Sequence, residues 1–166
     1  MIDQVLILCG GKGGRCENSK HKFLSDLNGK PVLQYLIQHY IAYGCKEIIL
    51  AAGYNYLDVV NFANSIRKLI HPVKIYCFWT GDDSGTAFRI ASMREIFNNP
   101  FYLTYADALS DIDLNNLSKM HSESGNVLTI TGVSPKVNFG VLHYSTENQI
   151  IRFEEKPVLR NIIVSG

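Results

Sequence analysis

The chain has 166 residues, of which 46% are hydrophobic and 19% charged, and its formal net charge is +1. This composition is that of a folded globular protein, and the length predicts a single domain over residues 1–166 with a sizeable core. The nearly neutral charge gives no basic surface for nucleic acid, and no apolar run reaches the roughly 18 residues that a membrane-spanning helix needs. We therefore expect neither nucleic acid nor a membrane as a partner.

The amino-terminal segment and the cysteines indicate the compartment. Asp3 precedes the first apolar run and no basic residue does, which is unlike a secretory signal peptide. The four cysteines, at positions 9, 16, 45 and 77, form no C-x-x-C pair, so free thiols are favoured over a zinc site or a disulfide framework. We expect a cytoplasmic protein.

Strand-like and helix-like segments alternate along most of the chain. In chain order the patterns predict a strand at 4–9, a helix at 31–44, a strand at 46–53, a helix at 56–70, a strand at 73–79, a helix at 86–97, a strand at 100–107 and a helix at 113–125, followed by strands at 126–133, 139–144 and 149–155. The alternation indicates a parallel sheet with helices on both faces, and the late strands suggest antiparallel additions. The predicted fold is α/β, a Rossmann-like three-layer α/β/α arrangement with a mixed, mainly parallel sheet.

The first strand runs directly into a glycine-rich loop, within the stretch LILCGGKGGRCENSKHK at 6–22. Ligands of parallel sheets bind beyond the carboxyl ends of the strands, where this loop and Asp107 are both expected. The chain contains no GKS or GKT, so the loop is not a P-loop, and Cys16 stands where a dinucleotide fingerprint needs its third glycine. A dinucleotide-dependent oxidoreductase is disfavoured for this reason, and because no acid ends the second strand.

The loop has the composition of a polyphosphate site. Gly10, Gly11 and Gly13 let the backbone turn sharply and direct N–H groups toward an anion. Arg15 and Lys22 can then add positive charge where a leaving group needs stabilisation. The alternative interpretation is a plain glycine turn followed by solvated lysines.

Several motifs continue in order down the chain and carry a family resemblance. They are GGKGGRC at 10–16, HKFL at 21–24, NGKPVLQYLI at 28–37, TGDDSGTAFRI at 80–90, YADALSDIDLNNLSKMH at 105–121, FG at 139–140 and FEEKP at 153–157. Together they resemble the signatures of the sugar-nucleotide-forming nucleotidyltransferases, and most of all those of the glucose-1-phosphate cytidylyltransferases. The resemblance covers nearly the whole chain.

The resemblance implies an enzyme that transfers a nucleoside monophosphate, with CMP from CTP favoured, to a sugar 1-phosphate. Pyrophosphate is released and a nucleotide sugar is formed, for use in surface polysaccharide. The implied partners are a nucleoside triphosphate and a sugar 1-phosphate, the implied cofactor is Mg²⁺, and a homo-oligomer is left open.

The same resemblance implies roles for individual residues. The catalytic residues would be Arg15 and Lys22, the nucleotide-binding residues Gly10, Gly11, Gly13, Gly85 and Thr86, the sugar-phosphate-binding residues Gly140, Glu155 and Lys156, and the magnesium ligand Asp107. Each has a simpler alternative: Asp107 could be a turn or helix-cap residue, Thr86 could simply begin a helix, and Lys156 could be solvated. Asp111 and Asp113 are expected to cap the following helix rather than bind metal.

The chain departs from the family pattern at several positions. Gly14 replaces a threonine or serine, and Ala106 and Ala108 replace two glycines, whose added methyl groups are expected to crowd the backbone near the ligand. The match ends at Gly166, before the family's second metal-binding aspartate, so the sequence is expected to be the amino-terminal part of a longer family domain. These departures motivate the alternative function, a catalytically weak or inactive nucleotide-binding module derived from this family.

Overall fold

The computed structural model describes residues 2–11, 21–97 and 99–159. The chain divides into two compact units, Met1–Gly125 and Asn126–Gly166. The single domain predicted from the length stays a prediction. No helix within the described residues combines the length and the apolar character that crossing a membrane requires.

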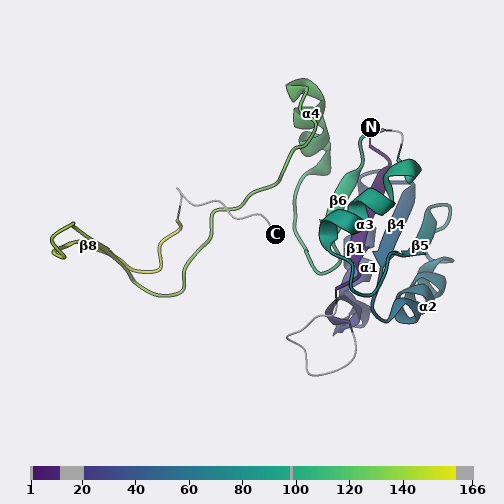
Figure 1. Cartoon of the computed structure of the whole chain (residues 1–166), viewed down its shortest axis with the longest axis horizontal. Helices are drawn as coiled ribbons and strands as arrows, with labels where there is room; N and C mark the ends of the chain where they lie inside the picture. The colour runs from purple at the N-terminus through teal and green to yellow at the C-terminus, as the bar shows by residue number, and fades with distance from the viewer. Residues whose placement is uncertain (1, 12–20, 98, 160–166) are drawn as a thin grey trace. The chain divides into compact units, whose positions relative to one another are not determined.

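The first unit is built on a four-stranded parallel sheet (Figure 1). In spatial order its strands are β5 (Lys74–Trp79), β4 (Glu47–Ala52), β1 (Gln4–Cys9) and β6 (Tyr102–Tyr105). From β1 the chain adds strands on one side as far as β5 and then crosses to the other side of β1 to form β6. The strand order therefore reverses between β1 and β6, which is the place where sheets of this type bind ligands.

Helices cover both faces of this sheet (Figure 1). In chain order they are α1 (Val32–Ala42), α2 (Tyr56–Ile66), α3 (Thr86–Ser92) and α4 (Leu114–Ser124). Residues of α1, α2 and α4 pack in one core, whereas α3 and the 3-10 turn η2 (Arg94–Ile96) pack on the opposite face. The predicted three-layer α/β/α fold with a mainly parallel sheet is confirmed.

Strand β1 contributes to both cores, as its nearly continuous apolar sequence requires. Val5, Ile7 and Cys9 lie in the core with α1 and α2, and Leu6 and Leu8 lie in the core beneath α3. Successive side chains of a strand point to opposite faces, so the part of the strand that is covered on both sides, Val5–Cys9, is apolar throughout.

The ends of α1 and α4 follow the predicted signals. Gly44 after α1 and Gly125 after α4 have positive φ angles of 91° and 65°, the left-handed conformation that glycine adopts most easily. The Asp113 carboxylate accepts hydrogen bonds from the backbone N–H groups of Asn115 and Asn116, at 2.9 and 3.1 Å. Asp113 therefore caps α4, as expected, while Asp111 is an exposed residue that precedes the cap.

Three short elements precede α1 that the patterns did not predict. A 3-10 turn, η1 (Lys22–Leu24), is followed by the hairpin of β2 (Asp26–Leu27) and β3 (Lys30–Pro31). Asn28 and Gly29 at the hairpin turn have φ angles of 52° and 83°. Positive φ at both central residues is typical of an Asn-Gly hairpin turn, so the sequence did carry the signal.

The second unit contains an antiparallel hairpin of β7 (Val141–Tyr144) and β8 (Ile150–Glu154), extended by a bridge between Lys136 and Val158. The late strands thus form a separate two-stranded sheet in place of the antiparallel part of a mixed sheet. The predicted strand over 126–133 is wrong: residues 126–132 carry no strand pairing. A strand needs a neighbour for its backbone groups, and an apolar sequence alone does not provide one.

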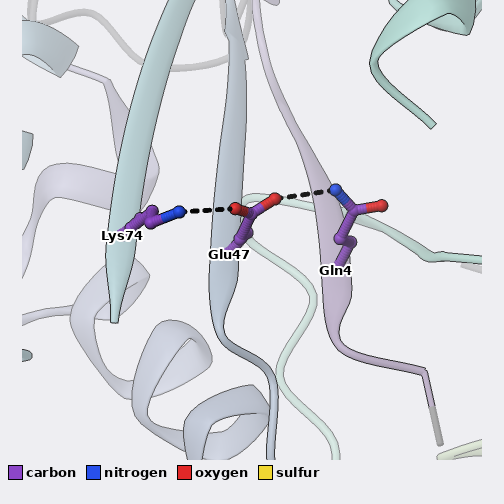
Figure 2. A network of polar contacts seen from close by, with 3 residues as sticks. All are labelled: Gln4, Glu47 and Lys74. Atoms are coloured by element: carbon purple, nitrogen blue, oxygen red, sulfur yellow. Dashed lines mark hydrogen bonds and ion pairs between the residues drawn. The ribbon is translucent and has the colours of Figure 1, made fainter. Parts of the chain in front are cut away.

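A polar network ties three strands together at the amino-terminal edge of the parallel sheet (Figure 2). The Glu47 carboxylate on β4 accepts a hydrogen bond from the Gln4 side-chain amide on β1 at 2.8 Å and another from the Lys74 ammonium on β5 at 3.3 Å. The Gln4 hydrogen bond first, and then Lys74, hold the pKa of Glu47 below its ordinary value, against the opposing effect of burial.

This lowered pKa predicts an acid-side dependence of stability. The stabilisation is complete above the ordinary glutamate pKa of about 4.3 and is lost as the pH falls through the lower pKa of the folded state. Glu47→Gln should lower Tm by about 1–3 °C at pH 7, a difference that shrinks toward pH 3, in thermal unfolding followed by circular dichroism. Glu123→Gln, in the exposed Lys119–Glu123 pair, is the matched control and should change Tm little at any pH. An equal Tm loss for Glu47→Gln at pH 3 and pH 7 would contradict this role.

Candidate functional site

The carboxyl ends of β1 and β6 bring two of the predicted site residues to the same level of the sheet. Leu8 pairs with Tyr105, and the N–H of Ala106 donates to the Leu8 carbonyl at 3.2 Å. The same register continued by two residues places Gly10 level with Asp107. Asp107 is exposed, and it does not cap α4.

Lys22 is an exposed cation on an anchored backbone. It begins η1, and its two neighbours are buried: His21 is 5% exposed and Phe23 is 7% exposed. The His21 and Phe23 rings stack at 4.6 Å, and His21 also meets Tyr54 edge to face at 6.2 Å. Because Tyr54 follows β4, this contact places the Lys22 segment at the carboxyl edge of the sheet.

Gly85 and Thr86 lie at the junction between the loop after β5 and helix α3. Gly85 is the extended residue before the helix, with φ −74° and ψ 164°, and Thr86 is the first helical residue. Both are exposed. Thr86 therefore does begin a helix, as its simpler interpretation held, at the same sheet edge that carries Gly10 and Asp107.

Arg89 is a residue of this edge to which the sequence analysis gave no role. It is 4% exposed. Its Nη1 donates to the Ala52 carbonyl at 3.2 Å and to the Thr80 hydroxyl at 2.5 Å, and its Nη2 donates to the Gly10 carbonyl at 2.9 Å. Burial lowers the pKa of the guanidinium, and the charge of Asp82 partly offsets this effect. The sequence did contain an indication that Arg89 belongs to the site, because Arg89 is the arginine of the TGDDSGTAFRI motif.

The glycines of the site have different reasons for lacking a side chain. A Cβ on Gly10 would come within 2.1 Å of the Arg89 guanidinium, so the packing of the protein itself excludes it. Among the described residues, a Cβ on Gly11 or Gly85 would meet no atom within 4 Å. Neither of these two glycines has a positive φ angle, so neither backbone strain nor packing against the described residues accounts for them.

The expected crowding by Ala106 is wrong. Its side chain is 2% exposed and lies in the core shared with α1 and α2, so its methyl group points away from the exposed edge. The replacement of glycine by Ala106 therefore adds apolar packing. Ala108, two residues further on, is half-buried.

Two of the predicted residues, Gly13 and Arg15, lie outside the described residues, as does Gly14. Their roles stay predictions. The structure thus brings together Gly10, Gly11, Lys22, Gly85, Thr86 and Asp107 at one edge of the parallel sheet.

The three predicted sugar-phosphate residues lie together within the second unit, at one end of the β7–β8 hairpin. A Cβ on Gly140 would meet the Phe153 ring at 2.4 Å and Glu155 Oε2 at 3.3 Å. The Lys156 ammonium lies 3.9 Å from Glu155 Oε1, and the Lys156 backbone has a positive φ of 47°. Gly140 therefore leaves space that the Phe153 ring uses, beside the Glu155 carboxylate.

Asp107 is the one predicted metal ligand. The described part of the chain contains no cluster of three or more histidine, cysteine, aspartate or glutamate side chains that could hold a metal by themselves. Magnesium is commonly bound by one or two carboxylates together with substrate phosphate oxygens, and the exposed Asp107 fits that mode.

The chain is similar to known proteins of one family. The model of the family described as nucleotidyl transferase matches residues 4–166. The chain is 33% identical over 186 residues to a probable glucose-1-phosphate cytidylyltransferase of Bacillus subtilis, covering 98% of this chain and 72% of the relative. It is 26% identical over 166 residues to a D-glycero-alpha-D-manno-heptose 1-phosphate guanylyltransferase of Campylobacter jejuni, covering 98% and 73%.

A solved structure with the same fold is that of HddC from Yersinia pseudotuberculosis, crystallised with GMP-PN. Its TM-score is 0.68 at 22% identity, over 93% of this chain and 70% of that one. The family match spans nearly the whole chain, and the resemblance found in the motifs is confirmed. The chain belongs to the nucleotidyl transferase family, and within it to the enzymes that act on sugar 1-phosphates.

Proposed function

We propose that the chain is a magnesium-dependent sugar-1-phosphate cytidylyltransferase, which transfers CMP from CTP to a sugar 1-phosphate. The observation that carries the proposal is the convergence of Gly10, Gly11, Lys22 and Asp107 on the sheet edge where the strand order reverses. An anion-binding backbone, a cation and a metal-ligating carboxylate are the groups that phosphoryl transfer needs.

The reaction needs no covalent enzyme intermediate. A phosphate oxygen of the sugar 1-phosphate attacks the α-phosphorus of CTP, the bond from that phosphorus to the bridging oxygen breaks, and pyrophosphate leaves with the electron pair. The protein's contribution is to position the two substrates in line and to stabilise the charge that moves to the leaving group. In this proposal the Gly10–Gly13 backbone and Arg15 hold the triphosphate, and Lys22 lies against the α-phosphate and the leaving pyrophosphate.

Asp107 would hold Mg²⁺ together with oxygens of the triphosphate. When bound, the ion supplies positive charge to the phosphate oxygens. At the same edge, Gly85 and Thr86 would contact the base, because the open backbone at Gly85 lets a planar ring approach closely.

The second unit would supply the sugar-phosphate contacts. Glu155 would accept hydrogen bonds from sugar hydroxyls beside Gly140, and Lys156 would pair with the phosphate of the acceptor. Their grouping at one end of the β7–β8 hairpin supports a shared role.

The proposal that the nucleotide substrate is CTP is more specific than the family assignment. It is supported by the 33% identity to the B. subtilis relative, while the C. jejuni relative is named for guanylyl transfer. Use of the product in surface polysaccharide and a cytoplasmic location belong to the same proposal. The free thiols of Cys9, Cys45 and Cys77 suit a reducing compartment.

The direct test is pyrophosphate release from CTP, UTP, GTP and dTTP, each with several sugar 1-phosphates. We expect turnover with one pair, and Lys22→Ala should lower kcat/KM by about a hundredfold or more because a charge at the leaving group is lost. The control is Lys68→Ala. Lys68 is an exposed lysine between the end of α2 and the amino end of β5. Activity equal to wild type in Lys22→Ala would contradict the assignment, and CTP binding with no turnover would favour the nucleotide-binding module.

A second test uses two glycines with opposite properties. Gly85→Ala adds a methyl group in open space without backbone strain, and because alanine is a poorer N-cap residue than glycine, Tm should fall by no more than about 3 °C. The affinity for CTP, measured by calorimetry, should nevertheless fall about tenfold because the methyl group intrudes on the base.

Gly125→Ala is the matched control, because its φ of 65° is strained for alanine although its surroundings are open. It should lower Tm and leave CTP affinity unchanged. Unaltered CTP binding in Gly85→Ala would remove Gly85 from the site.

A further inference from the structure

Arg89 is a buried cation whose hydrogen bonds join the carboxyl ends of three strands. Gly10 follows β1, Ala52 is the last residue of β4, and Thr80 follows β5. The Ala52 carbonyl also accepts from the Thr80 N–H at 2.8 Å and from the Thr80 hydroxyl at 2.7 Å. Since that hydroxyl donates to Ala52, its lone pairs are free to accept the short bond from Arg89.

We infer that Arg89 is a positioning residue that orients the Gly10–Gly11 peptide for triphosphate binding and couples it to the segment carrying Gly85 and Thr86. The nature of the bound anion rests on the proposed function. The orientation itself rests on the hydrogen bonds of Arg89.

The orientation follows from the geometry of one peptide group. The Gly10 carbonyl and the Gly11 N–H belong to the same planar trans peptide and point in opposite directions. Because the Gly10 carbonyl is held by Arg89 Nη2 at 2.9 Å, the Gly11 N–H points away from Arg89. The side of Gly11 on which a Cβ would stand is open within the described residues. Arg89 thereby prepares a backbone donor for an anion without touching it.

Arg89 also links the two predicted nucleotide-binding segments. Its own N–H donates to the Gly85 carbonyl at 3.1 Å, in the first turn of α3. Arg89 is thus hydrogen-bonded to both segments, through its guanidinium to Gly10 and through its backbone N–H to Gly85. Three of its five guanidinium N–H donors already serve Gly10, Ala52 and Thr80, and the side chain is buried, so we assign Arg89 a positioning role and not that of a phosphate ligand.

The glycines around Arg89 offer an independent test of the contact. All three atoms nearest to a Cβ on Gly10 belong to the Arg89 guanidinium, at 2.1 to 2.5 Å. A Cβ on Gly53 would meet the same guanidinium at 2.5 Å but also the backbone oxygen of Gly81 at 2.6 Å. Removing the arginine side chain therefore relieves a substitution at Gly10 and does not relieve one at Gly53.

The first experiment measures CTP and GTP binding by calorimetry, with kinetics where turnover is found. Arg89→Lys keeps the charge and loses the two-pronged geometry, so affinity for the triphosphate should fall about tenfold or more. KM for the triphosphate should rise while KM for the sugar 1-phosphate stays unchanged, a split that general destabilisation does not produce. The matched control is Arg67→Lys, because Arg67 Nη2 donates to a strand carbonyl, that of Ile75 at 3.4 Å, near the amino end of β5.

The second experiment is a double-mutant cycle followed by thermal unfolding, which needs no ligand. Gly10→Ala and Arg89→Met should each lower Tm, and the double variant should be no less stable than Arg89→Met alone, because both changes remove the same contact. Gly53→Ala should lower Tm further in the Arg89→Met background.

These two experiments separate the inference from the proposed function. Additive effects of Gly10→Ala and Arg89→Met, or wild-type triphosphate affinity in Arg89→Lys, would overturn the positioning role. If the wild-type protein binds neither CTP nor GTP, the proposed function fails, and the cycle alone decides whether Arg89 holds the Gly10–Gly11 peptide.

Discussion

Strand β1 is paired on both edges and buried on both faces, and the site depends on that position. It lies between β4 and β6 in parallel register, and its side chains alternate between the two cores. A strand fixed in this way delivers the backbone that follows it to one defined point. Since the strand order reverses beside β1, that point is flanked by Asp107 from β6 on one side and by the ends of β4 and β5 on the other.

At this edge the Arg89 side chain packs against the Gly10 backbone, which is possible because Gly10 has no Cβ. Gly10 lacks a side chain because the Arg89 guanidinium occupies that space, whereas Gly11 and Gly85 face open space among the described residues. One glycine thus serves packing and two expose the backbone. The hydrogen bonds from Arg89 to the Gly10 and Ala52 carbonyls offset part of the cost of burying its charge. At the opposite edge, the half-buried Glu47 carboxylate accepts hydrogen bonds from the two neighbouring strands.

Much of this arrangement could be predicted from the sequence, and the failures have physical reasons. The parallel sheet could be predicted from the alternation of strands and helices. A strand that is buried on both faces, such as QVLILC, is a short continuous apolar run, whereas an amphipathic helix has apolar residues three and four positions apart. The contact of Arg89 with Gly10 joins residues 79 positions apart and has no local signal. The strand expected over 126–133 was wrong because pairing depends on a neighbouring strand, which apolar residues such as Val127 and Leu128 do not specify. Ala106 was expected beside the ligand, but its direction depends on the pleat of β6.

We propose that a nucleoside triphosphate binds at the carboxyl ends of β1 and β6. A crystal structure of the protein with a non-hydrolysable CTP analogue and Mg²⁺ tests it most directly. We expect phosphate oxygens within hydrogen-bond distance of the Gly11 N–H and the Lys22 ammonium, with the metal on Asp107. Phosphates bound away from this edge, with Gly11 and Lys22 free of them, would contradict it.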